Sequence, residues 1–290
     1  MARTMNPPAV QPPTEYETIS VKTLTPHIGA EVRGVDLSEP LSPAQVADIR
    51  RAWADWQVLV FRDQQLDREQ HKAFGRHFGT LHVHPMNHFR DGDPEILVVK
   101  TTADSPYTAG EAWHTDVSCE AIPPMGSMLY ITETPEVGGG DTLYADMYLA
   151  YELLSEPMKR FLTGLTAIHD GGMPYVGNYK STPPEGGYPR TEHPVVARHP
   201  DTGRPLLYVN SGFTTRIEGL TKAESRAVLD MLFDHIATNP RLWCRVNWEP
   251  GTLTFWDNRC TQHHAVWDYW PHSRYGERVS VVGDEALQPY

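Results

Sequence analysis

The chain has 290 residues, of which 40% are hydrophobic and 21% charged, as is typical of a globular protein with a large core. Its formal net charge of −12 argues against general nucleic-acid binding, which needs a basic surface. No apolar run is long enough to cross a bilayer, and the N-terminal residues lack the apolar stretch of a secretory signal. Its three cysteines are widely spaced and predict reduced thiols, so we expect a cytoplasmic protein with no membrane or nucleic-acid partner.

The N-terminal part of the chain begins with a segment of unusual composition. Residues 1–17 are rich in proline and polar side chains, which predicts a flexible tail, and we expect residues 18–290 to form a single domain. Residues 18–36 are typical of two strands joined by a turn, because Gly29 and Gly34 interrupt an apolar pattern.

Two helices are predicted from capping signals. Ser42, followed by proline, is typical of an N-cap and predicts a helix over residues 43–56. Asp67 with Gln70 resembles a capping box, and we expect this second helix to end at His77. Strands are expected beside these helices, at residues 57–61 and 95–100.

The rest of the chain is predominantly β. Short apolar runs separated by turn residues are typical of the strands of a sandwich or barrel. One long helix is expected at residues 221–237, and a shorter helical stretch at residues 147–163. The expected strands cover residues 127–132, 141–145, 194–199, 205–209, 242–248, 251–256 and 278–283.

Residues 171–190 are rich in glycine, proline and tyrosine and are predicted to form a long loop. A loop of this length in a compact domain often covers a binding site, and the alternative is a disordered surface insertion. The sequence leaves both interpretations open, and it does not decide whether residues 102–112 act as a second lid.

A histidine and an aspartate two residues apart follow Trp113. In an extended segment, His114 and Asp116 would point to the same side and could share a metal ion. With one more histidine they would form the two-histidine, one-carboxylate set that suits non-haem Fe(II) and leaves positions open for ligands. The tripeptide alone is a weak signal, because a chain with 14 histidines produces such a pair by chance.

A second pair with the same spacing, His199 and Asp201, is interpreted differently. It lies in RHPDTGRP between two strand-like runs, where proline and glycine are typical of a turn. We therefore expect a hairpin turn at these residues and not a metal site.

The C-terminal run 255–284 strengthens the metal hypothesis. It contains the adjacent histidines His263 and His264, followed by Arg274 and Arg278. Two arginines near a metal are costly unless they meet anions, and a planar guanidinium suits a carboxylate or a sulfonate. The run therefore predicts an anion-binding region beside the metal.

Three motifs together resemble those of the TauD/TfdA family of Fe(II)- and 2-oxoglutarate-dependent dioxygenases. They are WHTDVS at 113–118, VGGGDTLY at 137–144 and WDNRCTQHHAVWDY at 256–269. The resemblance extends from IGAEVRGVDL at 28–37 to VVGD at 281–284. It implies a mainly β fold with flanking helices, the double-stranded β-helix or jelly roll, in agreement with the many expected strands.

The resemblance implies roles for five residues. His114, Asp116 and His263 match the metal ligands of the family, so the implied metal is Fe(II). Arg274 and Thr142 match the residues that hold the far carboxylate of the cosubstrate 2-oxoglutarate. The second cosubstrate is O2, and no catalytic residue beyond the metal ligands is implied.

The resemblance also concerns the substrate pocket. Arg278 and His84 match residues that meet the anionic head of the substrate in sulfonate-using relatives. Asn87 stands where the taurine-oxidising relative has a tyrosine, and Gly110 stands where it has an asparagine. We therefore predict a pocket that differs from a taurine pocket. The implied substrate is a small organic anion, such as a sulfonate like taurine, an alkyl sulfate or an aryloxyalkanoate.

The implied reaction hydroxylates the substrate while 2-oxoglutarate is decarboxylated to succinate and CO2. Because Asp116 keeps the carboxylate that related halogenases lack, we predict hydroxylation and not halogenation. Two alternatives remain open: a zinc-dependent hydrolase on the same ligands, and a cupin-like protein that binds metal and anion without turnover. Relatives are often dimers or tetramers, so a homo-oligomer is expected.

Overall fold

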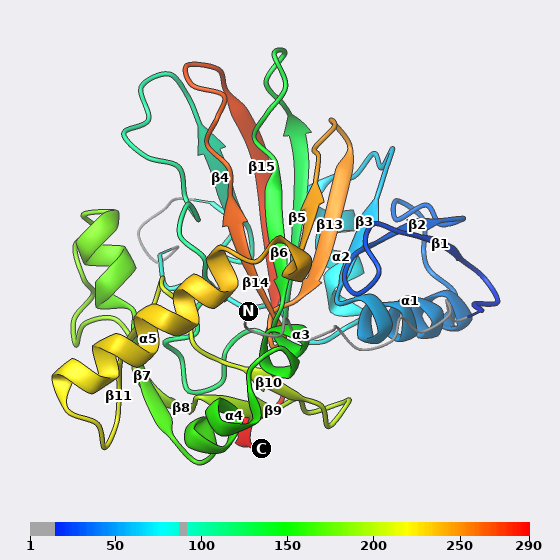
Figure 1. The fold of residues 1–290 in the computed structure, drawn as a ribbon. Helices are drawn as coiled ribbons and strands as arrows, with labels where there is room; N and C mark the ends of the chain where they lie inside the picture. Colours follow the sequence, from blue (N-terminus) through cyan, green and yellow to red (C-terminus); the bar gives the residue numbers. More distant parts are fainter. Residues whose placement is uncertain (1–14, 87–91) are drawn as a thin grey trace.

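The computed structural model describes residues 15–86 and 92–290, and strands predominate among them (Figure 1). Most of the predicted tail, residues 1–14, lies outside the described residues, as does Asn87. The boundary between tail and domain therefore stays a prediction.

A seven-stranded sheet is the largest element of the fold (Figure 1). All neighbouring strands in this sheet run antiparallel except one pair. The parallel pair is β2 with β3. In spatial order, the strands are β1 (Ser20–Thr23), β2 (Ala30–Arg33), β3 (Val58–Phe61), β13 (Thr252–Asp257), β5 (Gly126–Glu133), β15 (Arg274–Val281) and β4 (Leu97–Thr101).

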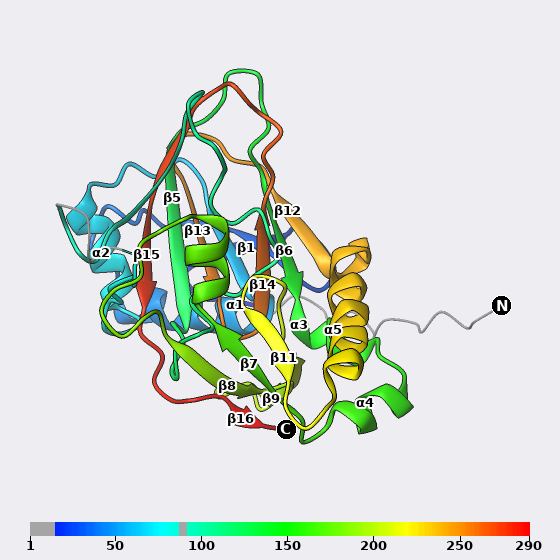
Figure 2. The same ribbon diagram turned by 90° about the vertical axis from the view of Figure 1, so that its left-hand side faces the viewer.

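A smaller sheet lies opposite the large one (Figure 2). It is made of β12 (Trp243–Val246), β6 (Thr142–Asp146) and β14 (Thr261–Ala265). Buried side chains of both sheets pack into one cluster, for example Val58 and Leu129 of the large sheet with Tyr144 and Val246 of the small one. Two largely antiparallel sheets that face each other across a shared interior form the jelly roll that the sequence predicts, so the fold class is confirmed.

The remaining strands form two three-stranded sheets at one end of the molecule. One contains β11 (Thr214–Ile217), β7 (Thr166–Asp170) and β8 (Arg190–Pro194), and the other contains β10 (Pro205–Leu207), β9 (Val196–Arg198) and β16 (Gln288–Pro289). The turn that joins β9 to β10 contains His199 and Asp201, so the predicted hairpin turn is confirmed.

Helices flank the sheets. They are α1 (Pro43–Trp56), α2 (Arg68–Arg76), α3 (Met147–Glu152), α4 (Glu156–Leu162), α5 (Lys222–Ala237) and two short irregular helices, η2 (Met173–Asn178) and η3 (Pro240–Leu242). Helices α1 and α2 pack on the large sheet, where Trp53 stacks on Phe255 with 4.3 Å between ring centroids. This packing leaves the opposite face of the sheet free to line the interior.

The capping signals place the predicted helices correctly. Ser42 and Asp67 both cap their helices with complete capping boxes, and α1 and α2 begin at the next residue. Thr221 does the same for α5. The helical stretch predicted at residues 147–163 is two helices, because the Ser155 hydroxyl caps a new helix after α3 has ended.

Two local expectations need correction. The segment 113–118 is not a strand: His114 forms a single antiparallel bridge with His263, and a turn begins at Asp116. Val117 has a φ of +49°, a left-handed conformation that a strand cannot contain. The segment 171–190 is also not a plain loop, because its first half contains the π-helix η2.

Within residues 15–86 and 92–290, none of the helices has the combination of length and apolar character that spanning a bilayer requires.

Two buried histidines away from the metal-ligand candidates make the fold sensitive to acid. Burial lowers the pKa of His71 to about 4, and burial together with the nearby His193 lowers the pKa of His169 to about 3. The unfolded chain, with an ordinary histidine pKa near 6.5, binds more protons in this range than the folded chain. The contribution of these two histidines to the free energy of unfolding is therefore complete above about pH 6.5, and it is lost as the pH falls toward their pKa values in the folded chain.

We predict that lowering the pH from 7 to 5 decreases the free energy of unfolding by about 2 kcal/mol for each of these histidines. The measurement is urea denaturation at several pH values, followed by circular dichroism. The variant His71→Leu should show a smaller pH dependence than the unmodified protein. An unchanged pH dependence in this variant would contradict the assignment.

Candidate active site

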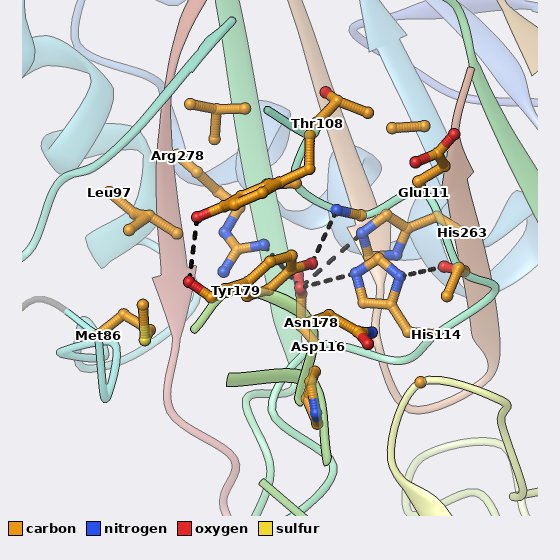
Figure 3. Close-up of a pocket in the computed structure, with 18 of the residues that line it drawn as sticks. Met86, Leu97, Thr108, Glu111, His114, Asp116, Asn178, Tyr179, His263 and Arg278 are labelled. Carbon is orange, nitrogen blue, oxygen red and sulfur yellow. Dashed lines mark hydrogen bonds and ion pairs between the residues drawn. The ribbon is translucent and has the colours of Figure 1, made fainter. Parts of the chain in front are cut away.

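Three side chains converge in the interior between the two sheets (Figure 3). The Nε2 atom of His114 lies 3.6 Å from Oδ1 of Asp116, and Nε2 of His263 lies 3.8 Å from the same oxygen. One ligand atom from each residue lies within 4.8 Å of the others. The structure thus brings together the three residues that the sequence predicts as metal ligands.

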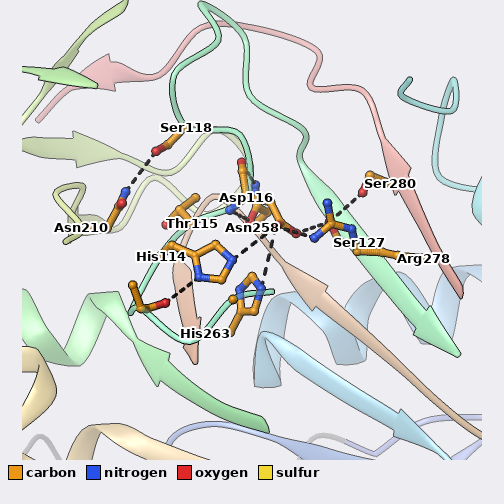
Figure 4. Close-up of polar contacts among 12 residues, drawn as sticks. His114, Thr115, Asp116, Ser118, Ser127, Asn210, Asn258, His263, Arg278 and Ser280 are labelled. Atoms are coloured by element: carbon orange, nitrogen blue, oxygen red, sulfur yellow. Dashed lines mark hydrogen bonds and ion pairs between the residues drawn. The ribbon is translucent and has the colours of Figure 1, made fainter. Parts of the chain in front are cut away.

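Main-chain pairing explains how ligands so far apart in sequence meet. The amide of His114 donates to the carbonyl of His263, and the amide of His263 donates back to the carbonyl of His114. One step along, the Thr115 hydroxyl donates to the carbonyl of Thr261. The loop with two of the candidate ligands therefore runs antiparallel to β14, the strand that carries the third (Figure 4).

Both histidines are in a form that can bind a metal. Nδ1 of His114 lies 2.7 Å from the carbonyl oxygen of Ala112. A carbonyl only accepts hydrogen bonds, so Nδ1 carries a proton, and in the neutral ring the lone pair is on Nε2, the nitrogen near Asp116. Burial lowers the pKa of His263 well below its ordinary value, with His114 acting in the same direction, so its ring is neutral at pH 7.

The carboxylate of Asp116 is ionised although it is buried. Burial raises its pKa, but the Arg278 guanidinium and the two histidines outweigh this effect and hold the pKa well below its ordinary value. Oδ1 accepts from Nη1 of Arg278 at 2.6 Å, and Oδ2 accepts from the Ser127 hydroxyl at 2.8 Å. The oxygen that faces both histidines is thus also the partner of Arg278.

Arg274 is a buried cation with an unused edge. Only 4% of its surface is exposed, and neither Nε nor Nη2 finds a hydrogen-bond partner among the described residues. Its guanidinium carbon lies 5.3 Å from the ring centroid of Trp248, and burial lowers the pKa of the guanidinium below its ordinary value. Such an arginine needs an anion, because an unpaired buried charge is costly.

Thr142 lines the same cavity as Arg274. Its hydroxyl accepts a hydrogen bond from Nε1 of Trp248 at 3.0 Å. Because the indole is only a donor, the proton of the hydroxyl is left for another acceptor. Thr142 and Arg274 together offer donors to an anion.

A cavity of about 920 Å³ is lined by the three candidate ligands together with Thr142 and Arg274. Arg278 and His84 line it as well, and His84 packs edge to face against Tyr175 at 5.8 Å between ring centroids. Most of the remaining lining is apolar. It includes Met86, Leu97, Val99, Leu129, Pro174, Tyr175, Phe213 and Trp256.

The two loops that the sequence leaves open as lids touch each other at this cavity. The rings of Tyr107 and Tyr179 stack at 5.0 Å between centroids, and the Tyr179 hydroxyl accepts from the amide of Gly110 at 3.1 Å. All three residues line the cavity. Movement of these loops stays a prediction, whereas their position at the cavity is observed (Figure 3).

Gly110 is required where it stands. Its φ is +86°, and a Cβ atom at this position would lie 3.1 Å from Cε1 of His114. A side chain here would strain the main chain and press on a candidate metal ligand. Glycine at this position therefore protects the position of His114.

The second histidine–aspartate pair does not build a metal site. His199, Asp257 and Cys260 do cluster and are buried. However, Asp257 accepts from Nε2 of His199 at 3.1 Å and from two nitrogens of Arg259 at 2.7 and 3.0 Å. The carboxylate is thus occupied by its own protein partners, and the cluster is structural.

Sequence reasoning missed two residues of the site, namely Ser127 and Trp248. Asn258, in the WDNR run that precedes His263, bonds to the main chain of Asp116 from 142 residues away. Ser127 and Trp248 act through contacts with Asp116 and Thr142, and their local sequence carries no signal for either role.

Comparison with known proteins identifies the family of the chain. A family model described as taurine catabolism dioxygenase TauD, TfdA family, matches residues 20–280. An alpha-ketoglutarate-dependent sulfonate dioxygenase of Saccharomyces cerevisiae is 34% identical over 287 residues, which cover 93% of this chain and 68% of that protein. An alkylsulfatase of Acinetobacter baylyi is also 34% identical over 287 residues, with coverage of 95% and 88%.

A solved structure shows the same likeness in three dimensions. The crystal structure of a taurine dioxygenase from Burkholderia xenovorans has 40% sequence identity and a TM-score of 0.79. The match covers 92% of this chain and 90% of that chain. Sequence and fold thus point to the same group of proteins.

The contact between Arg278 and Asp116 makes a prediction for the metal-free protein. Asp116→Ala leaves the Arg278 guanidinium without its carboxylate, and Arg278→Met leaves the carboxylate without its cation. The double variant removes both charges, so it should be more stable than the sum of the single effects by about 0.5–3 kcal/mol. Urea denaturation in the presence of a chelator measures this coupling. Strictly additive effects would show that the ion pair has no energetic role.

Proposed function

Because the chain belongs to the taurine catabolism dioxygenase TauD, TfdA family and is a 2-oxoglutarate-dependent dioxygenase, we propose that it binds Fe(II) through His114, Asp116 and His263 and hydroxylates a small organic anion. The observation that carries the proposal is the convergence of the three ligand atoms within 4.8 Å in a cavity that two arginines also line. In the reaction, 2-oxoglutarate is decarboxylated to succinate and CO2.

The donor set fits the metal. Two imidazoles and one ionised carboxylate on one side are the ligands that non-haem Fe(II) favours when other positions must stay open. Fe(II), when bound, supplies O2 activation and a chelation site for 2-oxoglutarate. The protein holds the ligands in place, and the Ala112 carbonyl accepts from Nδ1 of His114, which orients the ring so that Nε2 would face the metal.

Arg274 and Thr142 are suited to the far carboxylate of 2-oxoglutarate. Nε and Nη2 form one edge of the guanidinium, and two parallel donors on one edge match the two oxygens of a carboxylate. The Thr142 proton, directed by the bond from Trp248, adds a third donor. The cosubstrate would neutralise a buried cation that has no carboxylate partner among the described residues.

Arg278 and His84 are proposed to bind the anionic head of the substrate. Nη1 of Arg278 donates to Asp116, while its Nε has no hydrogen-bond partner among residues 15–86 and 92–290, so this nitrogen is left to donate to a second anion. The apolar lining suits the hydrocarbon part of the substrate. A sulfonate, an alkyl sulfate and an aryloxyalkanoate all combine an anionic head with such a part.

The alternatives receive less support. A zinc hydrolase, or a binding protein without turnover, would leave the unused edge of Arg274 without a purpose, and the relatives described above bear the names of oxidative enzymes or a sulfatase. The Asp116 carboxylate favours hydroxylation over halogenation, because no space for a halide is made at that position. The cytoplasmic location and the assembly into dimers or tetramers stay predictions.

The experiment is a succinate assay with Fe(II), 2-oxoglutarate and O2 over a panel of taurine, longer alkyl sulfonates, alkyl sulfates and aryloxyacetates. We predict succinate release that depends on at least one of these anions. Arg274→Ala should raise the KM for 2-oxoglutarate about 10- to 100-fold, because a charge-assisted bond contributes about 1.5–3 kcal/mol.

The matched control is Arg226→Ala, since Arg226 lies on the surface with 79% of its side chain exposed. This variant should keep the KM of the unmodified protein. A KM for 2-oxoglutarate that is equally unchanged in Arg274→Ala would contradict the proposed cosubstrate site. Absence of succinate with every anion, in folded and iron-loaded protein, would contradict the proposed activity.

A further inference from the structure

Asn258 lies in the turn between β13 and β14 and is fully buried. Its Oδ1 accepts from the main-chain amide of Asp116 at 2.8 Å. Its Nδ2 donates to the carbonyls of Asp116 and Pro124, both at 2.9 Å. One side chain therefore holds both the amide and the carbonyl of a candidate metal ligand (Figure 4).

These bonds replace a sheet that the chain does not form at this point. A turn begins at Asp116, and Val117 has a φ of +49°, so no ladder of strand hydrogen bonds fixes the main chain here. A carboxamide offers one acceptor and two donors in a plane, which matches one amide and two carbonyls. Neither aspartate nor a hydroxyl side chain can make the same three bonds.

The turn that carries Asn258 is itself held firmly. The main-chain amide of Asn258 donates to the carbonyl of Met125 at 3.0 Å, and the Thr261 hydroxyl donates to the carbonyl of Asp257 at 2.7 Å. The side chain of Asp257 is bound by His199 and Arg259. The bonds among His199, Asp257 and Arg259 thus hold the turn from which Asn258 reaches Asp116.

We propose that Asn258 is a positioning residue for the metal site, which fixes the main chain of Asp116 and thereby aims its carboxylate at His114 and His263. This inference rests on the proposed iron site and adds a residue that does not touch the metal or substrate. A ligand whose main chain can shift loses the alignment that coordination needs, and loss of such supporting contacts typically weakens metal binding about 10- to 100-fold.

The test measures the dissociation constant of Co(II), or of Mn(II), in the absence of cosubstrates. Asn258→Ala removes all three bonds, and Asn258→Asp keeps the size but places an acceptor where two carbonyls need donors. Both variants should bind metal about 10- to 100-fold more weakly than the unmodified protein. If Asn258→Ala does not fold, Asn258→Asp decides the question, because its packing is nearly unchanged.

The matched control is Asn210→Ala. Asn210 is also buried, and its side chain bonds to the Ser118 hydroxyl and to the main-chain amide of Phe213, neither of which belongs to a candidate ligand. This variant should lose thermal stability and keep the metal affinity. Asn258 variants with reduced melting temperature and unchanged metal affinity would overturn the inference. If the unmodified protein binds no metal, the proposed iron site fails, which is a different outcome.

Discussion

The site depends on the pairing of residues 114–116 with residues 258–263. Main-chain bonds join His114 to His263, the Thr115 hydroxyl bonds to Thr261, and the Asn258 side chain bonds to the main chain of Asp116. The loop with two candidate ligands is thereby docked along the strand and turn that carry the third. Val117, next to Asp116, has a left-handed main-chain conformation, so no strand pairing fixes this turn. Without the bonds named above, nothing would hold the Asp116 carboxylate between the two imidazoles. The jelly roll contributes by bringing β13 and β14 to this loop.

A second constraint is electrostatic. The chain carries a net charge of −12, yet two buried arginines line the cavity beside the candidate metal ligands. Arg278 is balanced by Asp116, whereas the outer edge of Arg274 meets no partner among the described residues. A cavity with fixed cations and an apolar remainder selects ligands that are anions with a hydrocarbon part. The metal would bind the Asp116 carboxylate, the cosubstrate would pair with Arg274, and the substrate would pair with Arg278. This explains why these three charged side chains line one cavity.

Much of this could be predicted from the sequence where the signal is local. Capping residues located α1, α2 and α5, and alternating apolar runs located most strands, because these patterns act over a few neighbours. The three ligand candidates and Arg274 followed from family motifs. Contacts between distant segments could not be predicted in this way. Ser127, Trp248 and Asn258 act on residues that the fold brings to them, and the left-handed Val117 has no signal that separates the turn from a strand.

The most direct test of the account is an anaerobic titration of the metal-free protein with Fe(II) and 2-oxoglutarate, followed by visible absorption. If the three ligands and Arg274 form one site, a weak metal-to-ligand charge-transfer band should grow and saturate at one equivalent of iron. Binding of an anionic substrate should then shift that band. A folded protein that gives no band, even with excess iron and 2-oxoglutarate, would contradict the claim that these residues form an Fe(II)–2-oxoglutarate site.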